Sequence, residues 1–219
     1  MGDVDRTDPL YDPVLTRRSI RRYASEPVSD EHIHRLLKAA MAAPSAGNQQ
    51  PWHFIVVTDR VMLNEIQKVH PYAAMLREAP LAIVVCGDPS NPDYPGYWVL
   101  DCSAATQNIL VEARLLGLGS VWLGVHCRAE REAGVRAVFD IPEEIEPLAI
   151  VAIGHPAEEK PWPTATSRSA CTYAAGELAG VAPAPCRQAG GTLRAYRFMR
   201  GVCCVQRDLG RDARRERFA

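Results

Sequence analysis

The stretch APSAGNQQPWHFIVV, residues 43–57, lies between two patterns with different hydrophobic periods. Before it, Ser29 precedes an acidic turn and apolar residues then recur at helical spacing. This pattern predicts an N-capped amphipathic helix over residues 30–43 that ends at Pro44. After the polar half of the stretch, HFIVVT (53–58) is a short β-branched run typical of a strand. The sequence therefore predicts a helix, a polar loop and a strand in direct succession.

Helices and strands continue to alternate along the chain. LAIVVCG (81–87) and PLAIVAIG (147–154) are bounded by turn residues, and with residues 53–58 they predict three central strands buried on both faces. Four further elements are expected: helices over 60–69, about 96–116 and 128–139, and a short strand or turn over 117–124. No GxGxxG follows a strand and no GxxxxGK[ST] is present, so a nucleotide would need a different kind of site.

Near the N-terminus, RRSIRRY (17–23) places four arginines around Ser19. Arginine has a planar fork of donors that suits phosphate, and a hydroxyl between two such forks can complete an anion site. A solvated helical face is an equal alternative for these residues alone. The polar loop also has two interpretations, because Ser45, Asn48 and Gln50 can address the edge of a heteroaromatic ring or form an ordinary turn.

Composition restricts the class of protein. The chain has 219 residues, of which 47% are hydrophobic, which is typical of a globular protein, and its formal net charge of −1 argues against a general nucleic-acid binder. Neither a membrane span nor the apolar run of a signal peptide is expected, so we expect a soluble cytoplasmic protein. Seven cysteines without a CxxC pair indicate neither a disulfide framework nor a metal site.

The character of the chain changes near residue 161. Residues 1–160 carry 15 basic and 22 acidic residues, a net charge of −7, whereas residues 161–219 carry ten arginines, no lysine and four acidic residues, a net charge of +6. Pro, Ala and Gly are scattered there without helical or strand period. We therefore expect a folded domain over residues 1–161 and an irregular Arg/Ala/Pro-rich tail over residues 162–219.

Four motifs in a fixed order carry a family resemblance: RRSIRRY, APSAGNQQPWHFIVV, GLGSVWLG (117–124) and PLAIVAIGHPAEEKP (147–161). With them the chain resembles, over residues 13–161, the nitroreductase-like family of FMN-dependent oxidoreductases. The resemblance implies an α+β fold, a mixed β-sheet flanked by helices, and an obligate homodimer with two FMN molecules at its interface. It also implies ping-pong hydride transfer from NAD(P)H through FMN to a nitroaromatic or quinone, with enone reduction, dehalogenation and flavin breakdown as open alternatives.

The resemblance also assigns individual residues. It implies that the phosphate and the pyrimidine end of the ring are bound by four residues: Arg17, Arg18, Ser19 and Arg21. It implies that the flavin is also reached from the partner subunit, by Pro44, Ser45, Asn48 and Gln50. It further implies that backbone lines the isoalloxazine near its reactive nitrogen, at Trp122, Leu123 and Gly124. Arg22 is expected to be a surface charge, and no side chain is expected to be catalytic because the flavin carries the chemistry.

After residue 161 the chain departs from the family pattern. Family members continue with a segment like xDRYxxxRVHxxxW, which supplies a basic residue to the phosphate and an arm packed on the partner, whereas this chain reads WPTATSRSACTY (162–173). Permitted codons for PTATSRSACT, read from the third base, encode Asp-Arg-Tyr-Glu-Ser-Glu-Arg-Val-His. We infer a frameshift near residues 161–163, after which the sequence was not selected to fold.

Other function classes follow from this departure. The main alternative to an enzyme is a catalytically impaired product that binds FMN and dimerises weakly because its C-terminal arm is replaced. A third option is nucleic-acid binding by the tail, but its arginines lack lysines and interleaved aromatic platforms. A yellow colour of the purified protein would favour the enzyme.

Overall fold

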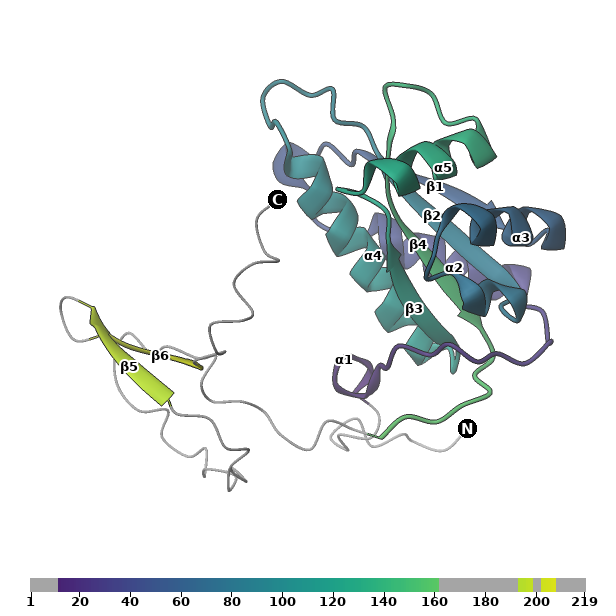
Figure 1. The fold of residues 1–219 in the computed structure, drawn as a ribbon, viewed down its shortest axis with the longest axis horizontal. Helices are drawn as coiled ribbons and strands as arrows, with labels where there is room; N and C mark the ends of the chain where they lie inside the picture. The colour runs from purple at the N-terminus through teal and green to yellow at the C-terminus, as the bar shows by residue number, and fades with distance from the viewer. Residues whose placement is uncertain (1–11, 162–192, 199–201, 208–219) are drawn as a thin grey trace. The chain divides into compact units, whose positions relative to one another are not determined.

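The computed structural model describes residues 12–161, 193–198 and 202–207 (Figure 1). The chain divides into two compact units, Met1–Pro161 and Trp162–Ala219, and each is described by itself. Within the described residues, no helix has both the length and the apolar character needed to span a bilayer.

An antiparallel sheet of four strands forms the centre of the first unit, in the order β1-β2-β4-β3. The strands are β1 (Trp52–Val57), β2 (Leu81–Gly87), β3 (Gly119–Gly124) and β4 (Glu146–Gly154). The central strands β2 and β4 are buried along nearly their whole length, as their unbroken apolar runs predict.

Helices cover both faces of this sheet (Figure 1). The helices are α1 (Pro13–Thr16), α2 (Asp30–Met41), α3 (Arg60–Val69), α4 (Tyr97–Leu115) and α5 (Ala129–Phe139). Helix α2 begins at its predicted cap, where Ser29 Oγ accepts the His32 N–H at 3.3 Å, and ends two residues earlier than expected. The other three predicted helices are confirmed within one or two residues at each end, and residues 117–124 form β3.

Two hydrophobic cores lie on opposite sides of the sheet. Because successive strand residues point to opposite faces, β2 sends Ala82, Val84 and Cys86 to the core with α3 and α5. The alternate residues Leu81, Ile83 and Val85 join the core with α2 and α4. Helix α4 is a core helix, as its apolar composition predicts.

The expected α+β fold, a sheet flanked by helices, is confirmed. Two details differ from the expectation. The described strand ladders are all antiparallel rather than mixed, and the one parallel pairing among the described residues is an isolated bridge between Ser19 and Ser120. In addition, β1 is an edge strand rather than a central one, and its His53 and Val56 are exposed. A β-branched run indicates a strand, but it does not specify whether another strand pairs on each side.

The second unit contains the antiparallel pair β5 (Leu193–Phe198) and β6 (Val202–Arg207). Both segments contain the aromatic or β-branched residues that favour strands. Residues 162–192, where the inferred frameshift would show its effect, lie outside the described residues.

Candidate functional site

The arginine segment, residues 17–23, is extended and not helical. Helix α1 is capped by Asp12, whose Oδ1 accepts the N–H groups of Val14 and Leu15 at 2.8 and 3.2 Å, and the helix ends before Arg17. The chain then runs beside β3, where the Ile20 N–H donates to the Ser120 carbonyl at 3.0 Å. This geometry removes the alternative of a solvated helical face.

Arg18 is partly committed to the backbone and partly free for a ligand. Its Nε donates to the Pro161 carbonyl at 3.1 Å, and its Nη1 donates to the carbonyls of Leu15 and Arg17 at 2.9 and 2.7 Å. Its Nη2 is buried without a hydrogen-bond partner among the described residues. An unpaired buried donor costs about 1–3 kcal/mol, so this atom suits a bound anion.

Lys160 and Glu158 meet the same segment, and sequence reasoning assigned neither of them. Lys160 Nζ donates to the Ser19 carbonyl at 2.6 Å and lies 3.3 Å from Glu158 Oε1. The Arg21 N–H donates to Glu158 Oε1 at 2.5 Å, and this bond is the main reason that the pKa of Glu158 is lowered. The only sequence signal was their place in the motif GHPAEEKP.

Arg22 belongs to a different part of the surface. Its Nε lies 3.0 Å from Glu78 Oε2, and two-thirds of its side chain is exposed. Glu78 also accepts the Tyr23 N–H at 3.1 Å, which lowers the pKa of this carboxylate. The side chain of Arg22 is thus an exposed ion-pair partner, in agreement with its expected role as a surface charge.

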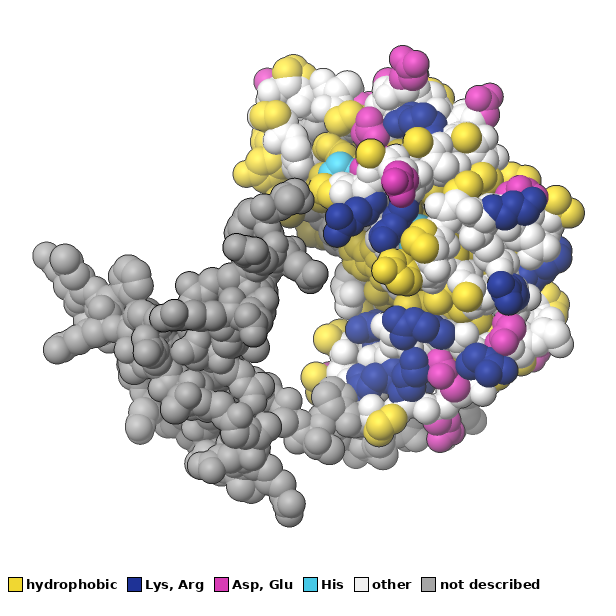
Figure 2. All heavy atoms as spheres, in the orientation of Figure 1, with side chains coloured by type: hydrophobic (Ala, Val, Ile, Leu, Met, Phe, Trp, Pro, Cys, Tyr) yellow, Lys and Arg dark blue, Asp and Glu magenta, His cyan; other side chains and the backbone are white. Residues whose placement is uncertain are grey.

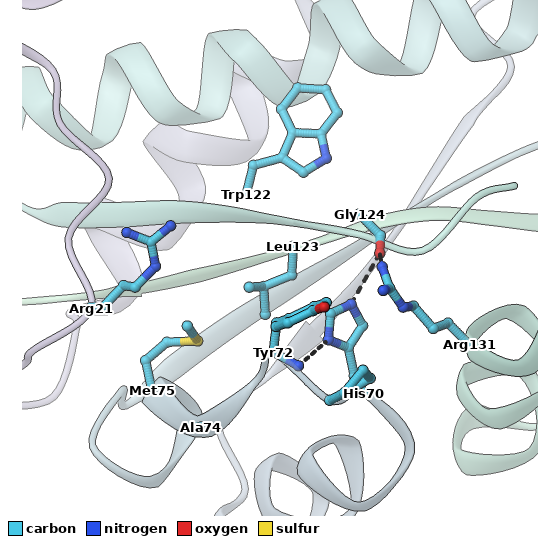
Figure 3. A pocket seen from close by; sticks show the side chains of 10 residues that line it. Arg21, His70, Tyr72, Ala74, Met75, Trp122, Leu123, Gly124 and Arg131 are labelled. Carbon is cyan, nitrogen blue, oxygen red and sulfur yellow. Dashed lines mark hydrogen bonds between the residues drawn. The ribbon is translucent and has the colours of Figure 1, made fainter. Parts of the chain in front are cut away.

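A cavity of about 490 Å³ lies at the outer edge of β3. It is lined by Arg21, by residues of the loop from His70 to Met75, by the end of β3 and by Arg131 of α5. Arg21 and Arg131 lie on opposite sides of Leu123 (Figure 3). On the surface, basic side chains flank an apolar hollow (Figure 2). The cavity therefore offers an apolar wall between two positive charges.

The backbone of β3 presents polar groups to this cavity. Its ladder with β4 continues into a bond from the Val125 N–H to the Leu148 carbonyl at 3.1 Å. In an antiparallel ladder the N–H and C=O of one residue point to the same side and alternate along the strand. The residues whose backbone groups therefore point away from β4 are Ser120, Trp122 and Gly124.

Gly124 has open space where a side chain would lie. A Cβ atom built on Gly124 meets nothing within 4 Å, whereas one on Gly119 of the same strand would lie 2.7 Å from Ile20 Cγ2. Packing therefore explains the glycine at residue 119 but not the one at residue 124. A planar ligand can approach the backbone of Gly124 closely from the cavity, so these residues fit a flavin ring.

His70 is a buried, neutral donor behind this wall. It is only 2% exposed, its Nδ1 accepts the Tyr72 N–H at 3.3 Å, and its Nε2 lies 3.0 Å from the Gly124 carbonyl. Because Nδ1 accepts, the proton must be on Nε2. Burial is the main cause that lowers the pKa of His70, which keeps the imidazole neutral.

The polar loop after α2, residues 44–50, has an unusual backbone. Gly47, Asn48 and Gln50 all have positive φ angles, of 56°, 56° and 51°, and residues 46–48 form a 3₁₀ turn. Asparagine adopts this left-handed conformation more readily than most residues, so the positive φ of Gln50 is the costly one. Strained backbone of this kind is concentrated at binding and active sites.

Side chains from inside and outside the loop hold it in this shape. Ser45 Oγ accepts the Gln50 N–H at 3.0 Å, and the mostly buried Asp101 of α4 accepts the Ala46 N–H through Oδ1 at 3.1 Å. Gln49 Nε2 is buried without a partner among the described residues. The loop is thus preformed and retains at least one donor suited to a ligand.

The structure brings only some of the predicted site residues together. Arg21 and the residues Trp122, Leu123 and Gly124 line one cavity, and Ser19 and Ile20 pair with Ser120 of the same strand. No residue of the loop 44–50 lines that cavity, and the loop leads into β1, at the opposite edge of the described sheet. The predicted site residues of one chain therefore form two separate groups, named the β3 half-site and the loop half-site.

Comparisons with known proteins cover the same part of the chain. A family model described as "Nitroreductase family" matches residues 14–155, a range that includes both half-sites. A protein of Archaeoglobus fulgidus, provisionally named an NADH dehydrogenase/NAD(P)H nitroreductase, is 53% identical over 156 residues, which cover 71% of this chain and 90% of that protein.

Solved structures agree with this match. A crystal structure from Parabacteroides distasonis, with the same provisional name, has a TM-score of 0.72 and 37% identity and covers 78% of this chain and 100% of that chain. An FMN-dependent nitroreductase from Clostridium difficile has a TM-score of 0.65 and 32% identity, and covers 73% of this chain and 93% of that chain.

Proposed function

Since the chain belongs to the nitroreductase family of oxidoreductases, we propose that it binds FMN and uses NAD(P)H to reduce a small acceptor, such as a nitroaromatic or a quinone, in a ping-pong cycle. The observation that carries the proposal is the cavity at the edge of β3, where Arg21 and the open backbone of Gly124 face the same space. FMN supplies the redox chemistry, since it accepts a hydride and passes electrons to the acceptor.

The arginine segment holds the phosphate in this proposal. Arg17, Arg18 and Ser19 offer charge-assisted and hydroxyl donors, and the unpaired Nη2 of Arg18 is the donor most in need of an acceptor. Lys160, which contacts the Ser19 carbonyl, adds a positive charge to the same place. Together these groups retain the cofactor through many turnovers.

The end of β3 holds the ring. Leu123 belongs to a hydrophobic core and Trp122 packs against the other one, so the strand is rigid, while the backbone of Trp122 and Gly124 points outward to a ring edge. Arg21 brings a positive charge to the pyrimidine end. The chain thus excludes water from one side of the ring and leaves the other side open to NAD(P)H and the acceptor.

The second half-site comes from another copy of the chain. Pro44, Ser45, Asn48 and Gln50 lie on a preformed loop away from the cavity of their own chain, so they reach a flavin only across a homodimer. Large apolar side chains on the surface of α1 and α4 supply area for such an interface: Val14, Leu15, Leu100 and Leu115. We therefore include the homodimer with two FMN sites in the proposed function.

Analysis of the pigment tests the proposal directly. The purified full-length chain, incubated with FMN and freed of excess, should be yellow, release FMN on heating and oxidise NAD(P)H when an acceptor is present. FMN rather than FAD is expected because the arginine segment suits a terminal phosphate. Release of FAD, or the failure of a folded sample to retain any flavin, would contradict the proposal.

A second candidate is the impaired product, which the composition of residues 162–219 favours. We infer that residues 1–161 are the FMN-binding domain and that the tail lacks the usual phosphate contact and dimer arm. Replacing the tail by the Asp-Arg-Tyr-Glu-Ser-Glu-Arg-Val-His continuation and the length of chain typical of relatives should then raise FMN affinity and dimer stability together through linkage. If neither quantity changes, the present tail is an adequate substitute.

A further inference from the structure

We propose that His70 and Arg131 are positioning residues that hold the Gly124 carbonyl from two sides and thereby keep the end of β3, which carries the Gly124 N–H, in place at the cavity. The proposal rests on the proposed FMN site, because the flavin ring is the ligand that this N–H would meet. It concerns two side chains that do not belong to the arginine segment, the polar loop or β3.

Two donors converge on one acceptor. His70 Nε2 lies 3.0 Å from the Gly124 oxygen, and Arg131 Nη1 lies 2.9 Å from the same atom (Figure 3). A carbonyl oxygen has two lone pairs and can accept both bonds at once. On the opposite side of the same peptide unit, the Val125 N–H donates to the Leu148 carbonyl at 3.1 Å. The peptide between Gly124 and Val125 is thus fixed at both ends.

Two features of Gly124 explain why its peptide needs to be held in place. The missing side chain of Gly124 lets a ligand approach the backbone, but glycine also has more conformational freedom than any other residue. Gly124 is at the end of an edge strand, where no neighbouring strand of the described sheet restrains its outer side. His70 and Arg131 take the place of that strand by bonding to the Gly124 carbonyl, so the end of β3 keeps its position at the cavity.

Each donor is itself held in place. Burial and the Tyr72 N–H leave His70 with its proton on Nε2, so the donor to Gly124 is present whenever the imidazole is neutral. The Arg131 guanidinium carbon lies 5.1 Å from the centre of the Tyr72 ring, in cation–π geometry. Tyr72 therefore contacts both donors, through its backbone and through its ring.

Paired variants separate positioning from simple packing. His70→Phe keeps a ring but loses the donor, whereas His70→Gln keeps an amide N–H at the end of a side chain of similar length. Arg131→Gln loses the charge and the fork of donors, and Arg128→Gln is its matched control, because Arg128 is exposed at the start of the same helix. The first measurement is the dissociation constant of FMN, from fluorescence quenching during titration of the flavin-free full chain.

We expect His70→Phe and Arg131→Gln each to weaken FMN binding roughly tenfold, His70→Gln to stay within about threefold of the unaltered chain, and Arg128→Gln to have no effect. In the flavin-free protein, hydrogen exchange over residues 119–126 should become about tenfold faster in the first two variants only. Equal weakening by His70→Phe and His70→Gln would overturn the proposal, as would equal effects of the two arginine variants.

The two readouts also distinguish this inference from the proposed function. If the unaltered chain binds no FMN, the proposed function fails, yet hydrogen exchange still shows whether His70 and Arg131 restrain β3. If FMN binds normally and no variant changes exchange or affinity, the positioning role fails while the flavin site stands. Should His70→Phe fail to fold, the comparison between Arg131→Gln and Arg128→Gln decides the question.

Discussion

The arginine segment and the polar loop after α2 are both rich in hydrogen-bonding groups, yet they are placed very differently. The segment runs along β3 and opens into a cavity of its own chain, whereas the loop leads into β1 at the other edge of the described sheet. Both are preformed in the single chain, one by Glu158 and Lys160 and the other by Asp101. This difference is the basis of our proposal that one chain supplies half of each site and that a second copy completes it.

The largest expected effect is at the β3 half-site. Gly124→Val puts a branched side chain into the space proposed for the ring, so FMN binding should weaken about a hundredfold or more, which is about 2.7 kcal/mol. The melting temperature should barely change, because nothing lies within 4 Å of the new Cβ. The control Gly119→Ala should do the reverse, with a loss of about 1–3 kcal/mol in stability from overpacking against Ile20. Titration and thermal unfolding of both variants check this contrast.

Within the arginine segment, the position of a side chain should affect FMN binding more than its charge does. Arg17→Ala or Ser19→Ala should weaken FMN binding by roughly ten- to a hundredfold, as expected when a hydrogen bond to a charged group is lost. Arg22→Ala removes the same charge as Arg17→Ala, but Arg22 is paired with Glu78, so FMN affinity should stay almost unchanged. Similar losses at Arg17 and Arg22 would mean that the segment acts only through its net charge.

At the loop half-site, the expected effect comes from substituting Asp101, the residue that anchors the loop. Asp101→Ala leaves the Ala46 N–H without its acceptor and should lower the free energy of unfolding by about 1–2 kcal/mol. The loosened loop should also weaken FMN binding by roughly fivefold. Asp101→Asn keeps an acceptor oxygen and serves as the control. An effect on stability without any effect on FMN binding would remove the loop from the site.

The smallest expected effect is the pH dependence that His70 gives to the stability of the chain. Because the pKa of His70 is lowered from 6.5 in the folded chain, the unfolded chain binds its proton first as the pH falls. The contribution of His70 to stability should therefore be complete above pH 6.5 and decline below it, by at most about 1.4 kcal/mol per pH unit. Urea unfolding between about pH 5 and 7.5 should show this slope in the unaltered chain and lose it in His70→Gln.

The same contrast shows how far sequence reasoning extends. Helical period and the cap at Ser29 located α2 because these signals act over a few neighbouring residues. The edge position of β1 was missed, since a strand's neighbours come from distant parts of the chain. Likewise the contacts of His70 with Gly124 and of Lys160 with Ser19 span 54 and 141 positions, and no local pattern predicts such pairs. The family resemblance pointed to the β3 backbone, but not to the side chains that hold it.

Mixed dimers test the central claim, that each site combines β3 of one copy with the loop of another. One chain carries Gly124→Val, the other carries Ser45→Ala with Asn48→Gly, and dimers containing one of each are isolated by two different affinity tags. Each altered chain alone should bind FMN weakly. If the halves combine across the interface, the mixed dimer has one site with both defects and one intact site, so it should bind one FMN per dimer with the affinity of the unaltered protein. If both halves come from the same chain, every site in the mixed dimer is defective, and the absence of a tight site would contradict the account.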